Sequence, residues 1–406
     1  MSILGEQQAR LMSTFRQHLA THGAAAFDLT LPDGETHKFR SNGHGNGADP
    51  EPPPAFRLHV RNHRGSRALL SMDEYAIAEA YVNADIDVEG DILEAFGLRR
   101  LFTDDHPMLS LLRFLQPLLA GRNRADRKAI HTHYDLGNEF YWTFLDQRHR
   151  LYSQALYRTG TESLEQAAEN KLNYIHDACR LGPGSRVLDL GAGWGAFSRF
   201  AASRGCNVTM LTLSEEQYAH LSKLSAEPSY DGRLTARLES IFELEPGERF
   251  DAIVLLGVME HLPDYHRLMR HLDTLLEAGG YLYMDFVATR KKRAISTFTH
   301  RHVFPGDHSP VVMHELIAAT NRVPLEIIAI HNDRHSYFLT AKAWAERLDA
   351  ARDKLSKSFG DKAVRSFQLY LWSVANCLYR DGDLESYRVV LKKSIGLPSP
   401  GTVHAA

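Results

Sequence analysis

Cysteine is scarce in this sequence, with three residues among 406. Cys179, Cys206 and Cys377 lie far apart and form no C-x-x-C pair, which argues against a disulfide framework or a thiolate zinc site and favours a reducing compartment. No stretch approaches the roughly 18 apolar residues of a membrane-spanning helix, and the first residues lack the continuous apolar core of a secretory signal. We therefore expect a cytoplasmic protein that meets membranes only at their surface.

An excess of basic residues is also absent, because the formal net charge is −3. Nucleic-acid-binding proteins usually carry a basic excess, so a nucleic-acid partner is not expected. Any anionic partner must then be bound by a local basic patch. The length predicts two or three domains, each large enough to bury a core.

Residues 1–120 form the first predicted domain. Residues 3–19 read as a weakly amphipathic helix, and residues 27–40 and 56–60 alternate apolar and polar side chains around a Pro-Asp-Gly turn, as strands do. Residues 107–128 are apolar and end in a basic cluster. This segment is either a core helix followed by a linker or a surface helix that lies on anionic lipid.

From about residue 160 to 345, strand-like apolar runs alternate with helical segments, which predicts a parallel sheet covered on both faces. The segments LEIIAIH (325–331) and SYFLTAKAW (336–344) read as two further strands that could pair antiparallel. Residues 345–395 read as helix, with Trp372, Leu378 and Tyr379 as core residues. The second domain is predicted to span residues 121–406.

The strongest motif is VLDLGAGWG at residues 187–195, an apolar strand that runs into Gly191, Gly193 and Gly195 and then a helix. Such glycines let a ligand approach the backbone closely, next to the free N–H groups of the helix. The spacing is G-x-G-x-G and not the G-x-G-x-x-G of a dinucleotide site. Asp189 ends the strand, where a carboxylate can balance the cationic end of S-adenosylmethionine.

The ends of the next strands supply the rest of the predicted cofactor site. Thr212, Leu213 and Gln217 follow the second strand, whose end reaches the ribose in Rossmann-like folds. Ser214 and Gln217 also fit a helix capping box, and both interpretations are compatible. Ser240 and Ile241 follow the third strand, where the adenine is expected.

Six motifs occur in order along the chain. They are RKAIHTHYDLGN at 127–138, LYSQALY at 151–157, VLDLGAGWG at 187–195, LTLSEEQ at 211–217, GVMEHL at 257–262 and HVFPG at 302–306. Together they resemble the cyclopropane-fatty-acyl-phospholipid synthase family, which includes the mycolic acid cyclopropane synthases and related fatty-acid methyltransferases, over roughly residues 60–390. The resemblance implies an α/β, Rossmann-like class I methyltransferase domain with a seven-stranded, mostly parallel sheet and helical C-terminal additions. It also implies a smaller α+β N-terminal domain that binds lipid, a homodimer, and a peripheral position on the inner face of the membrane.

The resemblance further implies a reaction. A cis double bond of a phospholipid acyl chain attacks the sulfonium methyl of S-adenosylmethionine, and a bicarbonate ion takes a proton from the resulting carbocation to close a cyclopropane ring. Glu260 matches the family's active-site glutamate, and Tyr337 matches a tyrosine that helps to hold bicarbonate. Tyr134 and Tyr152 match aromatic positions near the sulfonium, where ring faces suit a cation. Ser153 is placed with Tyr152 in the cofactor site.

Two positions depart from the family pattern. Gln154 stands where the family has a cysteine, and Asp285 stands where it has a histidine. A histidine can donate a hydrogen bond to an anion, whereas an ionised aspartate repels one. We therefore predict that Asp285, beside Glu260, takes part in a protein base and that Gln154 donates to any remaining anion. This favours a methyl-branched or methylene-bearing unsaturated product, with a ring as the alternative if bicarbonate still binds.

Some interpretations stay open at this point. The basic run at residues 290–293 is either a solvated loop or a clamp for lipid phosphate. His131 and His133 lack further ligands in the sequence, so no metal site is predicted. The alternative functions are a small-molecule methyltransferase on the same fold and a non-catalytic protein that binds lipid or cofactor.

Overall fold

A computed structural model describes residues 3–22, 25–40, 53–104, 136–244, 247–292, 295–304 and 308–395. Several predictions fall outside these ranges, namely the 107–128 helix, Tyr134, the histidines at 131 and 133, and Arg293. None of the helices in the described ranges is long and apolar enough to cross a membrane.

The N-terminal unit is a four-stranded sheet with helices, as its α+β pattern predicts. Its strands run in the order β2-β1-β3-β4, with β1 parallel to β3 and the other pairs antiparallel. The aromatic side chains of Phe15, Phe27 and Phe56 are buried in its core. Its elements are α1 (Ile3–His22), β1 (Phe27–Thr30), β2 (Thr36–Phe39), β3 (Phe56–Val60), α2 (His63–Ser71), α3 (Glu74–Val82), β4 (Ile86–Gly90), α4 (Ile92–Ala95) and η1 (Phe96–Leu101).

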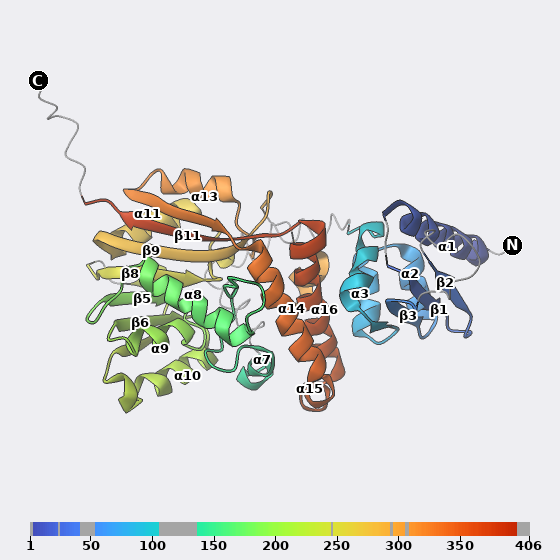
Figure 1. Ribbon diagram of the computed structural model, residues 1–406, viewed down its shortest axis with the longest axis horizontal. Helices are drawn as coiled ribbons and strands as arrows, with labels where there is room; N and C mark the ends of the chain where they lie inside the picture. The colour runs from blue at the N-terminus through green and yellow to red at the C-terminus, as the bar shows by residue number, and fades with distance from the viewer. Residues whose placement is uncertain are drawn as a thin grey trace, which may run out of the picture.

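The larger unit is built on a seven-stranded sheet with the order β10-β11-β9-β8-β5-β6-β7 (Figure 1). Strands β5 to β9 are mutually parallel, whereas β11 runs antiparallel to both β9 and β10. This is the predicted seven-stranded, mostly parallel sheet of a class I methyltransferase. Its strands are β5 (Arg186–Leu190), β6 (Asn207–Thr212), β7 (Leu234–Leu238), β8 (Phe250–Leu256), β9 (Leu276–Ala288), β10 (Leu325–Asn332) and β11 (Glu385–Lys393).

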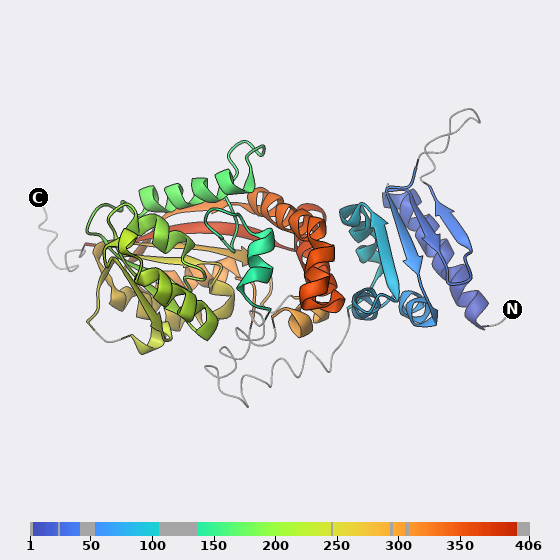
Figure 2. The ribbon, with the colours of Figure 1, turned by 90° about the horizontal axis from the view of Figure 1, so that it is seen from below.

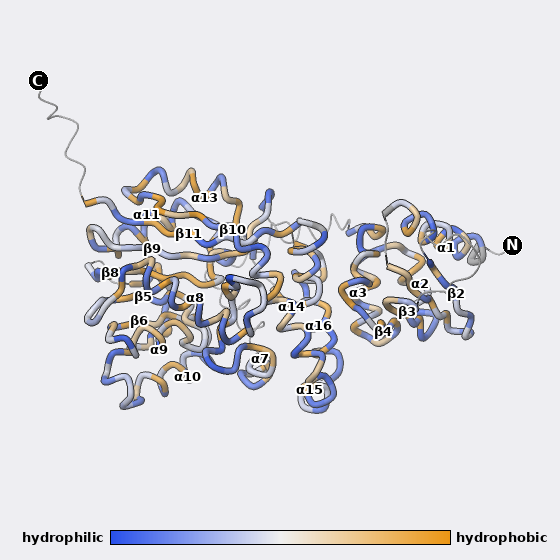
Figure 3. Tube along the Cα trace, viewed as in Figure 1, coloured by the Kyte–Doolittle hydropathy of each residue, from blue (hydrophilic) through white to orange (hydrophobic). Residues whose placement is uncertain are grey.

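Apolar cores cover both faces of this sheet, which explains the continuous apolar runs of its central strands (Figure 3). Helices α8, α9 and α10 pack on one face and α11 and α13 on the other. The helices of this unit are α7 (Asn138–Phe144), α8 (Leu164–Ala178), α9 (Ala196–Ala202), α10 (Glu215–Ser225), α11 (Tyr265–Leu275), α12 (Thr297–His302), α13 (Met313–Thr320), α14 (Arg334–Ala350), α15 (Arg352–Phe359) and α16 (Asp361–Asn376). The short helical turns are η2 (Pro228–Tyr230), η3 (Ile241–Glu243), η4 (Met259–His261) and η5 (Cys377–Asp381).

The prediction for the last hundred residues was partly wrong. The segment 336–344 is not a strand but part of α14, because Phe338, Ala341, Ala345 and Leu348 are buried at helical spacing. The antiparallel partner of β10 is instead β11, in a region predicted as helix. Trp372 and Leu378 are buried as predicted, but Tyr379 is 52% exposed.

Helices α14 and α16 lie between the large sheet and the N-terminal unit (Figures 1 and 2). Arg365 on α16 is 1% exposed and reaches into the N-terminal unit. Its guanidinium donates to the carbonyls of Tyr81 at 2.6 Å and Ile86 at 2.8 Å, and it pairs with Asp87 at 3.2 Å. A buried arginine with three partners ties the two units together.

Candidate active site

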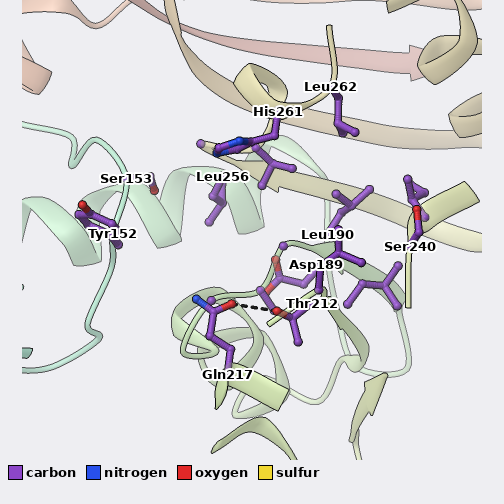
Figure 4. A pocket seen from close by; sticks show the side chains of 18 of the residues that line it. Tyr152, Ser153, Asp189, Leu190, Thr212, Gln217, Ser240, Leu256, His261 and Leu262 are labelled. Carbon is purple, nitrogen blue, oxygen red and sulfur yellow. Dashed lines mark hydrogen bonds between the residues drawn. The ribbon is translucent and has the colours of Figure 1, made fainter. Parts of the chain in front are cut away.

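A pocket of about 200 Å³ opens where the carboxyl ends of β5, β6 and β8 meet, as expected for a ligand site in a doubly wound sheet. Ten of the eleven predicted cofactor residues line it. They are Tyr152, Ser153, Asp189, Gly191, Gly193, Thr212, Leu213, Gln217, Ser240 and Ile241. Figure 4 shows Tyr152 and Ser153 on one side of the pocket and Ser240 on the other, with Asp189, Thr212 and Gln217 between them.

The glycines of the motif have different roles. Gly193 has φ +56°, and a Cβ there would meet no atom within 4 Å, so the missing side chain leaves open space toward the pocket. A Cβ on Gly191 would lie 2.6 Å from Cγ2 of Val258. Gly195 is not among the lining residues; it precedes α9, and a Cβ would lie 2.8 Å from Cδ2 of Leu224. The missing side chain allows close packing against α10, and the cofactor contact of Gly195 stays a prediction.

Asp189 lies at the end of β5 with 2% exposure. Burial raises the pKa of its carboxyl to about 6, although the Ser198 hydroxyl donates to Oδ2 at 2.5 Å and lowers it. A buried carboxylate of this kind is stabilised by a cation placed against it. The amino and sulfonium groups of S-adenosylmethionine are such cations, so the residues present fit this cofactor.

The residues after β6 share capping and pocket roles. The Ser214 hydroxyl accepts from the Gln217 N–H at 3.3 Å and caps α10. The reciprocal half of the predicted capping box is not formed, because Oε1 of Gln217 accepts instead from the Thr212 hydroxyl at 2.8 Å (Figure 4). The Gln217 amide is thereby held at the pocket wall. Ser240 forms a full capping box with Glu243 at η3.

A second cavity of about 690 Å³ adjoins the first. Tyr152, Ser153, Gly257 and His261 line both cavities, so the two spaces meet at these residues. The second cavity also contains the predicted catalytic residues Gln154, Glu260, Asp285 and Tyr337 in its wall. The structure therefore brings these four residues together, although 183 positions separate the first from the last.

Glu260 lies on η4 and is 4% exposed. Its Oε1 accepts from the Val287 N–H at 2.6 Å, whereas Oε2 has no hydrogen-bond partner among the described residues. Burial raises the pKa of this carboxyl from 4.5 to about 7. A group with such a pKa and a free oxygen at the cavity wall is suited to accept a proton near neutral pH.

Asp285 has a partner that the sequence analysis missed. Nζ of Lys171 on α8 lies 2.8 Å from Oδ2 of Asp285 and donates to the Ser153 hydroxyl at 2.7 Å. Both charged side chains are at most 2% exposed. Burial raises the pKa of Asp285 and lowers that of Lys171, while their mutual attraction opposes both shifts. The negative charge expected to repel an anion is thus compensated by Lys171.

Gln154 is held by a second charged pair. Its Nε2 donates to Oδ2 of Asp333 at 3.1 Å, and its Oε1 accepts from the Ser386 hydroxyl. Asp333 is paired in turn with Arg388 at 2.8 Å. Both ends of the Gln154 amide are therefore engaged with protein groups, and the second hydrogen of Nε2 is the one that the predicted donation to an anion would use.

Tyr337 projects from α14 and lines the cavity beside Trp344, with ring centroids 6.2 Å apart. Burial raises its pKa well above 10, so the phenol keeps its proton and can donate it in a hydrogen bond. Tyr152 packs against Trp194 and Trp344 at the junction of the two cavities. The side chain of Tyr134 lies outside the described residues.

The basic run after β9 divides into two parts. Arg290 and Lys291 are exposed and line the larger cavity. Lys292 instead pairs with Glu315 at 2.5 Å and lies over the ring of Tyr265. In the described ranges no group of three or more potential metal ligands is found.

Comparison with known proteins identifies the family of this chain. The model of the mycolic acid cyclopropane synthetase family matches residues 121–389. The chain belongs to this family. It is accordingly a methyltransferase that uses S-adenosylmethionine, which agrees with the fit of Asp189 and the glycine loop.

Two relatives align with most of this chain, one over 82% of it and the other over 65%. A probable fatty acid methyltransferase of Pseudomonas putida is 30% identical over 351 residues, covering 82% of this chain and 86% of the relative. The cyclopropane-fatty-acyl-phospholipid synthase of Escherichia coli is 29% identical over 267 residues, covering 65% of this chain and 67% of the relative. Among solved structures, the cyclopropane synthase MmaA2 of Mycobacterium tuberculosis superimposes with a TM-score of 0.61 at 24% identity, covering 66% of this chain and 98% of that one, and supports the fold.

Proposed function

We propose that this enzyme transfers the methyl carbon of S-adenosylmethionine to a double bond in an unsaturated acyl chain of a membrane phospholipid. The observation that carries the proposal is the cavity of about 690 Å³ that meets the cofactor pocket at Tyr152, Ser153 and Gly257 and has Glu260 in its wall. A cavity of this volume, lined by both aromatic and titratable groups, suits an apolar chain that must be held against a reactive methyl group. The names of the two relatives, a probable fatty acid methyltransferase and a cyclopropane-fatty-acyl-phospholipid synthase, support the same substrate class.

The π electrons of the acyl double bond form a bond to the methyl carbon, and the bond from that carbon to sulfur breaks. S-adenosylhomocysteine leaves, and a carbocation remains on the neighbouring chain carbon. Loss of a proton from the chain then restores a double bond, and Oε2 of Glu260 accepts that proton. We propose Glu260 as this base because its pKa is raised to about 7 and its Oε2 has no hydrogen-bond partner among the described residues.

This route gives a methyl-branched unsaturated chain; a methylene-bearing chain would require a hydride shift that moves the cation to the methyl-bearing carbon, followed by loss of a proton from the new methyl group. Support comes from the two positions that differ from the family pattern. An ionised Asp285, paired with Lys171, has no hydrogen to donate to a bicarbonate ion, and Gln154 is already bound to Asp333 through one hydrogen of Nε2 and to Ser386 through Oε1. A cyclopropane would form instead if a base removed the proton from the newly added methyl group.

The test is product analysis. Purified protein is incubated with S-adenosylmethionine and vesicles of unsaturated phospholipid, and the fatty acids are fragmented in a mass spectrometer. A gain of one CH₂ supports the proposal, and hydrogenation to a saturated methyl-branched chain supports the proposed product. A product that resists hydrogenation is a cyclopropane and refutes the deprotonation route. No mass gain would instead favour a small-molecule acceptor or a non-catalytic role.

We also propose that Arg290 and Lys291 hold the lipid phosphate at the membrane surface. Both are exposed cations in the wall of the second cavity, which we propose holds the acyl chain, and no ion pair engages them within the described ranges. Arg290→Glu should weaken sedimentation with anionic vesicles severalfold. Lys292→Glu makes the same change of charge two positions along the chain, at a residue already paired with Glu315, and is the matched control. Equal weakening by both variants would indicate general electrostatics and not a clamp.

A further inference from the structure

Arg150 lines the cofactor pocket and was not among its predicted residues. Its guanidinium lies over the ring of Trp142, with the central carbon 3.7 Å from the ring centroid, and it forms no hydrogen bond or ion pair within the described ranges. A guanidinium stacked on an aromatic ring is fixed in orientation, and its N–H groups still point outward in its own plane. Arg150 is therefore a set of donors without an anion, in the wall of a pocket whose cofactor carries one carboxylate.

The loop that carries Arg150 is held in place by Asp146, which is buried. Its Oδ1 accepts from the His149 N–H at 2.6 Å, and its Oδ2 accepts from the Leu151 N–H at 2.7 Å. Between these two residues Arg150 has φ +60°, a left-handed conformation that a residue with a side chain rarely adopts. Both oxygens of Asp146 are thus occupied by the backbone of the loop, and the guanidinium of Arg150 remains available to a ligand.

A second cation increases the positive charge around this loop. Nη2 of Arg199, on the helix that follows the glycine loop, donates to the His149 carbonyl at 2.7 Å. Burial lowers the pKa of Arg150, and the charge of Arg199 lowers it further. An anion bound at Arg150 would offset this repulsion.

Arg150 lies at the end of the pocket where the amino-acid part of the cofactor is expected. It precedes Tyr152 by two positions, and Figure 4 shows Tyr152 on the side of the pocket opposite Ser240, which marks the predicted adenine end. A second arginine in the wall, Arg267, lies over the ring of Phe242 at 3.9 Å, in the turn that follows Ser240. The two arginines therefore belong to opposite ends of the pocket.

We infer that the guanidinium of Arg150 binds the carboxylate of S-adenosylmethionine and of its product S-adenosylhomocysteine. Asp189 meets the cationic groups at the same end of the cofactor, so the two residues recognise its opposite charges. Hydrogen bonds between a guanidinium and a carboxylate are charge-assisted and are among the strong ones in proteins. Arg150 therefore makes the enzyme select cofactors that keep this carboxylate. The inference does not depend on which acceptor receives the methyl group.

The test compares two ligands by titration calorimetry on the full chain, without any acceptor lipid. One is S-adenosylhomocysteine, and the other is its decarboxylated form, which keeps the amino group and the adenosine. We expect the wild-type protein to bind S-adenosylhomocysteine at least tenfold more tightly. Arg150→Gln should weaken S-adenosylhomocysteine at least tenfold and change the affinity for the decarboxylated form less than twofold. Arg267→Gln, the matched control, removes a stacked cation from the same wall and should leave the ratio of the two affinities within twofold of the wild-type value.

Three results would overturn the inference. Equal affinities of the wild-type protein for the two ligands would do so without any variant, and hence even if Arg150→Gln failed to fold. An unchanged ratio in Arg150→Gln would assign the carboxylate to other groups of the pocket. An equal fall of the ratio in both variants would indicate the general charge of the pocket and not a contact. A failure of the proposed function would appear only in the product analysis with vesicles, because no acceptor is present here.

Discussion

The buried pair of Lys171 and Asp285 gives the sharpest test of the site's electrostatics. Lys171→Met removes one charge from a pair whose side chains are at most 2% exposed and leaves Asp285 without its cation. Breaking a buried pair in this way costs about 3–5 kcal/mol of folding free energy, because the remaining charge is uncompensated. For a unit of this size we expect the melting temperature to fall by about 10 °C.

The double variant Lys171→Met/Asp285→Asn is the control for this loss. It removes both charges and keeps an amide oxygen that can accept from the Gly257 N–H, as Oδ1 of Asp285 does at 3.2 Å. We expect it to recover at least half of the lost stability in urea unfolding, since a neutral pair carries no desolvation cost of ions. Equal stability of the single and double variants would refute the reasoning.

The destabilisation caused by the single variant Lys171→Met should depend on pH. Without Lys171, burial is opposed only by hydrogen bonds from Tyr283 and the Gly257 N–H, so the pKa of Asp285 in the folded state lies further above 3.8, the ordinary value. At pH values between the ordinary pKa of the unfolded state and the raised pKa of the folded state, the folded protein binds a proton that the unfolded protein does not. The stability of the variant therefore falls as pH rises through this range. The destabilisation by Lys171→Met should therefore be smaller at pH 5 than at pH 8. A destabilisation that is the same at both values would mean that Asp285 is not the group left charged.

Three further predictions concern other parts of the site. Because Glu260 must be ionised to accept a proton, kcat/KM should rise with pH through about 7. Glu260→Gln should remove this rise and lower the rate by about 10² or more, while calorimetry still detects cofactor binding. An unchanged pH profile in the variant would exclude Glu260 as the base. Gly193→Ala should weaken cofactor binding at least tenfold, whereas Gly184→Ala, which has a similar positive φ and open surroundings outside the pocket, should leave it unchanged; equal effects would point to backbone strain alone. Arg365→Leu should lower the free energy of unfolding by about 3 kcal/mol and speed proteolysis between the two units. Arg352→Leu, which breaks a long surface pair of 3.8 Å with Asp361, should lower it by less than about 1 kcal/mol. Similar protease resistance in both variants would contradict the role of Arg365.

The cofactor pocket could be predicted from the sequence because its residues come from short segments that directly follow strands. Asp189 and Gly193 lie four positions apart, and Thr212 and Gln217 lie at the next strand end. Parallel strands bring their carboxyl ends to one edge of the sheet, so the sequence pattern and the spatial arrangement coincide. Glu260 and Asp285 were predicted by a different route, because they occupy positions that match the family's active-site residues.

Lys171 could not be placed opposite Asp285 by such reasoning, because 114 positions and several strands separate them. A signal was nevertheless present. Lys171 stands on the apolar face of α8 together with Ala167, Leu172 and Ile175, and a lysine there is almost never buried without a partner. The error at 336–344 has another cause, since a short apolar run with several aromatic residues is compatible with either a strand or a buried helix. Only packing against α16 decides for the helix.

The arrangement of charges around the cavity argues for Glu260 as the base. Asp285 faces Lys171 at 2.8 Å, and Asp333 faces Arg388 at 2.8 Å, so each of these buried carboxylates has a cation within contact distance. Glu260 forms no ion pair in the described ranges, and a backbone N–H engages only one of its oxygens. A compensated carboxylate is a weak proton acceptor, whereas a buried, uncompensated one gains stability when it takes up a proton. The two ion pairs thus leave Glu260 as the group best able to receive the proton that a carbocation in this cavity must lose.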